Sequence, residues 1–164
     1  MTATTMRTTT KTRAMFVPRD EGELLLGLGS TMTVKATSDD TGGTMEWVLI
    51  ESGPGGDVIP HRHPWGEAYY VLDGSMEVQV GARRHVASAG DFVMIPPRAV
   101  HSVRVLSDCA RFLHVSVGYG ATAMFGDLSA VTEDGSDLAD PATVAALGEV
   151  ATRYGIEMLQ PEQV

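Results

Sequence analysis

The sequence predicts one all-β domain, built as an antiparallel sandwich or barrel and followed by a helical C-terminal extension. Three observations support this prediction: short strand-like runs fill the middle of the chain, turn residues separate them, and helical periodicity comes only after about residue 120. The length of 164 residues suits one domain with one sizeable core. With 43% hydrophobic and 20% charged residues, the composition excludes a wholly disordered chain.

The strand-like runs lie between residues 24 and 118. They cover residues 31–37, 44–51, 68–72, 75–80, 91–95, 100–106 and 111–117. Clusters of glycine, proline and aspartate separate them, such as the pair Asp73 and Gly74. Many short strands at this spacing, with no helices between them, are typical of β-sandwiches and barrels.

The two ends of the chain differ from this β region, and we expect three parts. Residues 1–20 form a Thr-rich tail, residues 21–120 form the barrel, and residues 121–164 hold an acidic loop and a C-terminal helix packed on the barrel. Asp140 can cap a helix over residues 141–154, and Gly155 can end it in a left-handed conformation. A shorter helix is expected near residues 123–130.

Charge and composition exclude several classes of partner. The formal net charge is -9, with only 12 Lys and Arg residues, whereas binding to nucleic acid or anionic membranes needs clustered basic residues. No run approaches the roughly 20 apolar residues that span a bilayer. Cys109 is the only cysteine, so no intrachain disulfide can form. Because no apolar run follows the basic residues of the tail, we expect a cytoplasmic protein.

Histidines and one glutamate form the most informative pattern. His61 and His63 are two residues apart, so on an extended chain both imidazoles point to the same face. Asp73 and Gly74 predict a two-residue hairpin turn that places Leu72 opposite Ser75. The inward cross-strand pairs would then be Val71 with Met76, Tyr69 with Val78, and Glu67 with Val80.

A carboxylate on that inward, apolar face must be paired or bound to a metal, because burying a bare charge is costly. His101 shares a face with Val103 and Val105, so it also points inward. The sequence therefore predicts a site for a first-row divalent metal. Its ligands would be His61, His63, Glu67 and His101, leaving up to two octahedral positions free.

These segments resemble the two motifs of the cupin superfamily. The first motif reads G-x5-H-x-H-x3,4-E-x6-G, and the residues that match it are Gly55, His61, His63, Glu67 and Gly74. The second reads G-x5-P-x-G-x2-H-x3-N, and the residues that match it are Gly90, Pro96 and His101. Arg98 replaces the glycine and Val105 the asparagine, and neither replacement affects a ligand position.

The resemblance implies the cupin double-stranded β-helix, a jelly-roll barrel, over residues 24–118. It also implies a homodimer that would cover sheet edges and an outer face carrying Tyr70 and Leu72. The C-terminal segment Tyr154-Gly155-Ile156-Glu157 is similar to the tail of single-domain cupins related to quercetin 2,3-dioxygenases.

The function implied is that of a metal-dependent enzyme. The leading hypothesis is a dioxygenase that holds a small aromatic or enolic metabolite and molecular oxygen beside Fe(II), Mn(II) or Ni(II), with Zn also compatible. Glu67 is the candidate catalytic residue, either as a ligand or as a base. Two alternatives stay open. One is a non-oxidative isomerase, cyclase, lyase or dehydratase that uses the metal as a Lewis acid, and the other is a non-catalytic ligand-binding cupin.

Four further residues are candidates for the substrate pocket. Trp65, Tyr69 and Met76 could line an apolar cavity, although plain core filling explains them equally well. Arg98 could pair with an anionic substrate group, against the simpler view of a solvated arginine.

Three other reactive side chains are expected to lie outside the site. His114 is predicted to face outward, because Leu113, Val115 and Val117 make the more apolar face of its strand. His85 is expected on the surface, and Cys109 has no base nearby to activate it.

Overall fold

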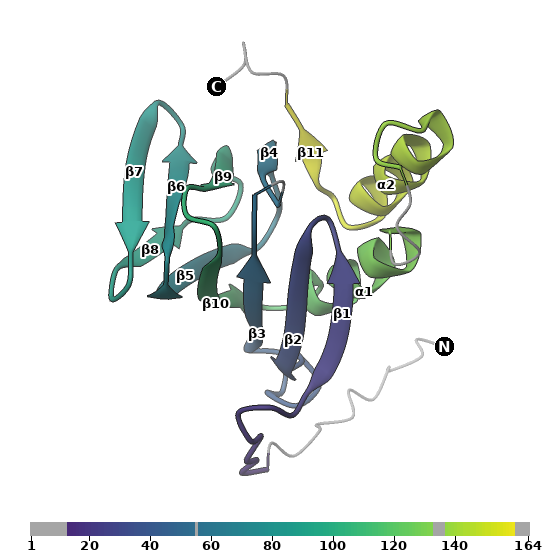
Figure 1. Ribbon diagram of the computed structural model, residues 1–164. Coiled ribbons are helices and arrows are strands. Elements are labelled where there is room, and N and C mark those ends of the chain that lie inside the picture. Colours follow the sequence, from purple (N-terminus) through teal and green to yellow (C-terminus); the bar gives the residue numbers. More distant parts are fainter. Residues whose placement is uncertain (1–12, 55, 133–136, 160–164) are drawn as a thin grey trace, which may run out of the picture.

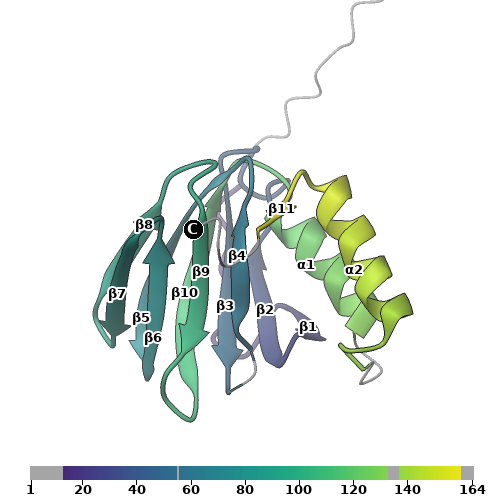
Figure 2. The ribbon, with the colours of Figure 1, turned by 90° about the horizontal axis from the view of Figure 1, so that it is seen from above.

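The computed structural model describes residues 13–54, 56–132 and 137–159. Two antiparallel β-sheets face each other, and two helices lie along one side of them (Figures 1 and 2). This arrangement confirms the all-β jelly-roll prediction with its helical extension. The tail up to residue 12 and residues 133–136 of the expected acidic loop lie outside the described residues.

The first sheet has six strands in the described part of the chain. In spatial order they are β1 (Glu23–Gly27), β2 (Ser30–Ala36), β3 (Met45–Ser52), β10 (Ala110–Val117), β5 (Gly66–Asp73) and β8 (Phe92–Ile95). The second sheet has five, in the order β11 (Glu157–Met158), β4 (Val58–Arg62), β9 (His101–Val105), β6 (Ser75–Val80) and β7 (Arg83–Ser88). Strand β6 coincides with the predicted run 75–80, whereas β1, β4, β7 and β11 were not among the expected strands.

The core lies between the two sheets, where alternate residues of each strand are buried. Strand β5 buries Glu67, Tyr69 and Val71, and β6 buries Met76 and Val78. This is the alternation that a half-buried strand requires. The outward residues of β5 carry the exposed side chains of Tyr70 and Leu72, as the sequence predicts.

The predicted hairpin between β5 and β6 is wrong. Strand β5 pairs with β10 and β8, and β6 pairs with β7 and β9, so the two strands belong to different sheets. Gly74, with a φ of 73°, carries the chain from one sheet to the other. A Cβ at this position would lie 2.2 Å from the carbonyl oxygen of Cys109, so the crossing requires glycine. The inward faces are nevertheless correct, because alternation along a strand does not depend on its partner.

The C-terminal extension contains helices α1 (Ala121–Thr132) and α2 (Pro141–Arg153). The Asp140 side chain accepts hydrogen bonds from two backbone N–H groups of the first turn of α2, as the sequence predicts. Gly155 has a φ of 68°, and Ile156 N–H donates to the Ala151 carbonyl, which ends the helix. Helix α1 packs on β1 and β3, while α2 packs on α1 and β11 (Figure 2).

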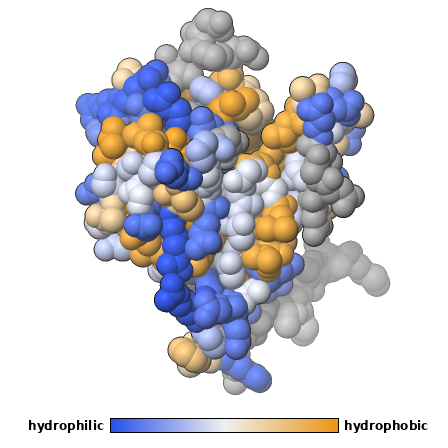
Figure 3. Space-filling model, viewed as in Figure 1, coloured by the Kyte–Doolittle hydropathy of each residue, from blue (hydrophilic) through white to orange (hydrophobic). Residues whose placement is uncertain are grey.

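The surface mixes polar and apolar residues. On the face seen in Figure 3, hydrophobic side chains form several separate patches between hydrophilic ones. No helix in the described residues is both long enough and apolar enough to cross a membrane.

Candidate metal centre

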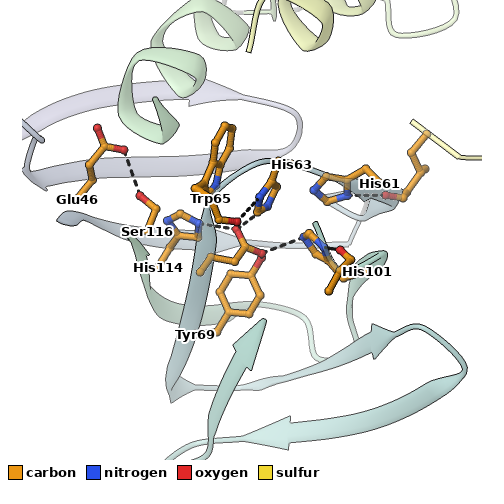
Figure 4. Close-up of polar contacts among 11 residues, drawn as sticks. Glu46, His61, His63, Trp65, Tyr69, His101, His114 and Ser116 are labelled. Carbon is orange, nitrogen blue, oxygen red and sulfur yellow. Dashed lines mark hydrogen bonds and ion pairs between the residues drawn. The ribbon is translucent and has the colours of Figure 1, made fainter. Parts of the chain in front are cut away.

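Three buried histidines from the second sheet and its flanking loop meet inside the barrel (Figure 4). His61 lies on β4 directly opposite His101 on β9, and His63 follows β4. One ring nitrogen from each lies within 4.8 Å of the others. The strand parity that predicts a common face for these side chains therefore brings them to one point.

Each of the three imidazoles is oriented by a backbone carbonyl. The Nδ1 atoms lie 2.9–3.0 Å from the carbonyl oxygens of Ile59, Trp65 and Ala99, for His61, His63 and His101 respectively. A carbonyl only accepts hydrogen bonds, so we assign the Nδ1 position as protonated in all three rings. The lone pair of a neutral ring is then on Nε2, which is how protein backbones prepare histidines to bind metals.

Glu67 on β5 completes the group from the opposite sheet. Its side chain is 4% exposed, and its carboxylate oxygens lie 3.1 Å from His63 Nε2 and 3.0 Å from His101 Nε2. Two acceptors this close repel each other unless a shared proton or a metal cation lies between them. His101 Nε2 is also fully buried and has no well-aligned hydrogen-bond partner in the described residues. Three nitrogen donors and one carboxylate suit a first-row divalent metal.

Burial and neighbouring charges set the protonation states of this cluster. Burial, aided by His101, lowers the pKa of His61 to about 4, so His61 is neutral at neutral pH, the form that binds metal. Burial alone would raise the pKa of Glu67, but contacts with His101, His114 and His63 hold it well below the usual value. Burial would lower the pKa of His101, but its contact with Glu67 outweighs this and raises it. The contact with Glu67 therefore favours the protonated form of His101, and a metal bound at this nitrogen would displace that proton.

His114 belongs to this buried group, and the prediction that it faces outward is wrong. Its Nε2 lies 3.0 Å from Glu67 Oε2 (Figure 4). The inward face of β10 carries Phe112, His114 and Ser116 instead of the aliphatic residues between them. Those aliphatic residues lie on the outer face of β10, which is a central strand of its sheet. This outer face is also apolar. The aromatic residue Phe112, two residues before His114, is the sequence signal that indicates the inward face, and the structure buries it.

Trp65 and Tyr69, both predicted pocket residues, contact the candidate ligands. The indole of Trp65 stacks on the imidazole of His63, with ring centroids 4.3 Å apart. The hydroxyl of Tyr69 donates a hydrogen bond to Glu67 Oε1. Both side chains are buried.

Met76 and Arg98, the other two predicted pocket residues, have different surroundings. Met76 is fully buried in the core between the sheets. The Arg98 side chain is exposed, but its backbone N–H donates to the His63 carbonyl at 2.8 Å and so ties the two histidine segments together. Arg98 stands where the second cupin motif has glycine, and its φ of 63° is in the left-handed region that glycine favours.

The C-terminal extension borders the histidine cluster. Strand β11 pairs with β4, placing Met158 opposite His61. Beside this pair, the Arg62 guanidinium donates to the Glu157 carboxylate at 2.5 Å. Trp65 packs in a second apolar cluster with Ala121, Met124 and Val150 of the two helices.

A surface hollow of about 570 Å³ lies away from this cluster. Its lining includes Leu28, Glu51 and Cys109, and none of the four candidate metal ligands. The hollow lacks converging metal-binding or acid–base groups, whereas the buried histidines and Glu67 form such a group. The candidate site is therefore this cluster and not the hollow.

Comparisons with known proteins agree with this architecture. The family described as "Cupin domain" matches residues 48–116. A quercetin 2,3-dioxygenase of Bacillus subtilis (strain 168) is 30% identical over 100 residues, which cover 59% of this chain and 29% of that protein. The chain therefore matches less than a third of the length of this relative.

Solved structures share the fold at low sequence identity. KdgF from Halomonas sp. superposes with a TM-score of 0.60 at 18% identity, covering 68% of this chain and 99% of that chain. The polyketide cyclase RemF from Streptomyces resistomycificus gives a TM-score of 0.55 at 24% identity, covering 64% and 80%. The region that matches the cupin domain family, residues 48–116, holds both histidine segments and Glu67, and this match supports a cupin superfamily protein.

Proposed function

We propose that this protein is a metal-dependent cupin enzyme of the dioxygenase type, acting on a small aromatic or enolic metabolite. The observation that carries the proposal is the convergence of three backbone-oriented histidines on one buried, ionised carboxylate. The 30% identity to a quercetin 2,3-dioxygenase favours oxidative chemistry over the alternatives. Fe(II), Mn(II) or Ni(II) at the site would supply Lewis acidity and would orient the substrate and oxygen.

The protein's own groups have distinct tasks in this proposal. His61, His63 and His101 would hold the metal through Nε2, because their Nδ1 atoms are engaged by the backbone. Glu67 would serve as the fourth ligand, or accept the proton of an enolic substrate at one carboxylate oxygen. The Tyr69 hydroxyl would hold the other oxygen in place.

Two pocket residues would act on the substrate side. The indole of Trp65 would exclude water from His63 and present an apolar surface to an aromatic ring. Arg98, exposed beside the His63 segment, would pair with an anionic group of the substrate.

Oxygen uptake tests this proposal directly. Metal-loaded protein is assayed with an oxygen electrode against flavonols and small enolic acids, beside His61→Ala and Glu67→Gln. The control is His85→Ala, which alters an exposed histidine outside the cluster. We expect oxygen-dependent turnover that falls about 100-fold or more in Glu67→Gln and disappears in His61→Ala. Equal turnover with and without oxygen would contradict the dioxygenase and indicate the non-oxidative class.

A further inference from the structure

The Glu67 carboxylate has close neighbours of two kinds. Two are the Nε2 atoms of His63 and His101, which are candidate metal ligands. The other two are groups outside the ligand set, the Tyr69 hydroxyl at Oε1 and His114 Nε2 at Oε2, 3.0 Å away (Figure 4). Each carboxylate oxygen therefore has one neighbour of each kind.

The orientation of His114 makes it a hydrogen-bond donor. An ionised carboxylate only accepts, so the proton on the nitrogen facing Glu67 is assigned to Nε2 of His114. Its Nδ1 is buried and has no hydrogen-bond partner in the described residues, which suits a bare lone pair better than an N–H. The ring also packs edge to face on Phe125 of α1, with centroids 5.3 Å apart. Packing and the hydrogen bond together define one orientation.

We propose that His114 is a positioning residue that keeps Glu67 in the metal coordination shell, an inference that rests on the proposed metal centre. Once His63 and His101 direct their Nε2 lone pairs to a cation, neither can donate a hydrogen bond to Glu67. His114 then supplies the remaining hydrogen bond from a ring nitrogen, and it holds Oε2 while the carboxylate faces the metal. Such outer hydrogen bonds orient metal ligands and raise metal affinity.

A pair of amide variants tests this role. The amide nitrogen of His114→Gln can occupy the place of Nε2 and donate to Glu67, whereas His114→Asn is one methylene shorter and cannot reach. His114→Leu removes the donor while keeping most of the volume, in case the asparagine variant does not fold. Co(II) is the probe: its dissociation constant is measured by chelator competition, and its visible absorption reports the coordination shell. His85→Asn is the control on an exposed histidine.

We expect His114→Asn and His114→Leu to weaken Co(II) binding about 10- to 100-fold and to change the Co(II) spectrum. His114→Gln and His85→Asn should keep the wild-type spectrum and nearly the wild-type affinity. Unchanged affinity and spectrum in the asparagine and leucine variants would overturn the positioning role alone. Complete loss of Co(II) in every His114 variant, including glutamine, would also overturn it, because it would make His114 itself a ligand. A wild-type protein that binds no Co(II) would overturn the metal centre and this inference together.

Discussion

The imidazole of His63 and the indole of Trp65 stack with their planes 10° apart. Trp65 also packs against both helices of the C-terminal extension, through Ala121, Met124 and Val150. One side chain therefore connects a candidate metal ligand to a part of the chain that lies outside the two sheets. Because Trp65 packs on both the extension and His63, changes at Trp65 should affect both stability and metal binding.

Replacing Trp65 with alanine should lower the free energy of unfolding of the metal-free protein by about 3–5 kcal/mol, because it leaves a cavity in this cluster. Trp65→Phe should cost less, since the ring can still stack on His63. It also breaks no hydrogen bond, as Trp65 Nε1 has no partner in the described residues. Urea unfolding measures both variants. Equal stabilities for Trp65→Ala and the wild type would show that this packing contributes nothing.

Tyr69→Phe should remove one of the hydrogen bonds that hold Glu67. Burial raises the pKa of Tyr69 well above its usual value, so the hydroxyl remains a donor throughout the ordinary pH range. Hydrogen bonds to charged groups contribute about 1.5–3 kcal/mol, and the free energy of unfolding should fall by that amount. The matched control is Tyr70→Phe, the next residue on β5, whose side chain is exposed on the opposite face. A similar loss in both variants would contradict the assignment.

The sequence predicts which face of a strand a residue lies on, but not which strands pair with one another. Alternation along a strand places Glu67, His61 and His101 on inward faces, and the structure agrees. The pairing between strands does not follow from alternation. The turn at Asp73 and Gly74 has the composition of a hairpin, yet it joins two sheets, because the choice of partner depends on the whole barrel.

The same distinction explains why the sequence pattern does not indicate the positions of His114 and Met158. His114 lies on a strand whose two faces are both partly apolar, so hydrophobicity alone chooses the wrong one. The pairing of Met158 with His61 joins segments far apart in the chain, and a two-residue strand leaves no periodic signal. These contacts depend on tertiary packing, which local patterns do not contain.

Protonation of Glu46 in acid should lower the free energy of unfolding of the protein. Burial alone would raise the pKa of this carboxyl, but hydrogen bonds from Thr122 and Ser116 outweigh it and lower the pKa below 4.5. The unfolded chain therefore binds this proton more readily than the folded one. The stabilisation is complete above pH 4.5 and is lost as the pH falls through the lower, folded-state pKa.

Glu46→Gln should accordingly be less stable than the wild type by about 1.5–3 kcal/mol at neutral pH, and the difference should shrink in acid. Urea unfolding between about pH 3 and pH 7 measures this linkage. The control is Glu149→Gln, which changes an exposed carboxylate on α2. A stability gap that stays constant with pH would show that the charge on Glu46 is not responsible.

The predicted homodimer has a specific surface to test. Strand β8 is at the edge of its sheet, and Phe92 and Met94 are 63% and 66% exposed there. Phe92 lies opposite Tyr70 on β5. The exposed side chains of Phe92, Met94 and Tyr70 therefore lie on one apolar outer face of the sheet. Covering this face, and the edge of β8 that no strand of the described residues pairs with, would favour association of two copies.

Light scattering should therefore give the mass of a dimer, and Met94→Lys should shift it toward the monomer. Val144→Lys makes the same change at another exposed position, on α2, and should leave the dimer intact. A monomeric wild type, or a dimer unaffected by Met94→Lys, would contradict this assignment of the interface.

Elemental analysis of protein purified without chelators shows whether the three histidines and Glu67 hold a metal. We expect about one equivalent of a first-row divalent metal per chain in the wild type, retained in His85→Ala and lost in His61→Ala and in His101→Ala. Metal that persists in the last two variants, or a wild type that takes up none when supplied with Fe(II), Mn(II), Ni(II) or Zn(II), would contradict it.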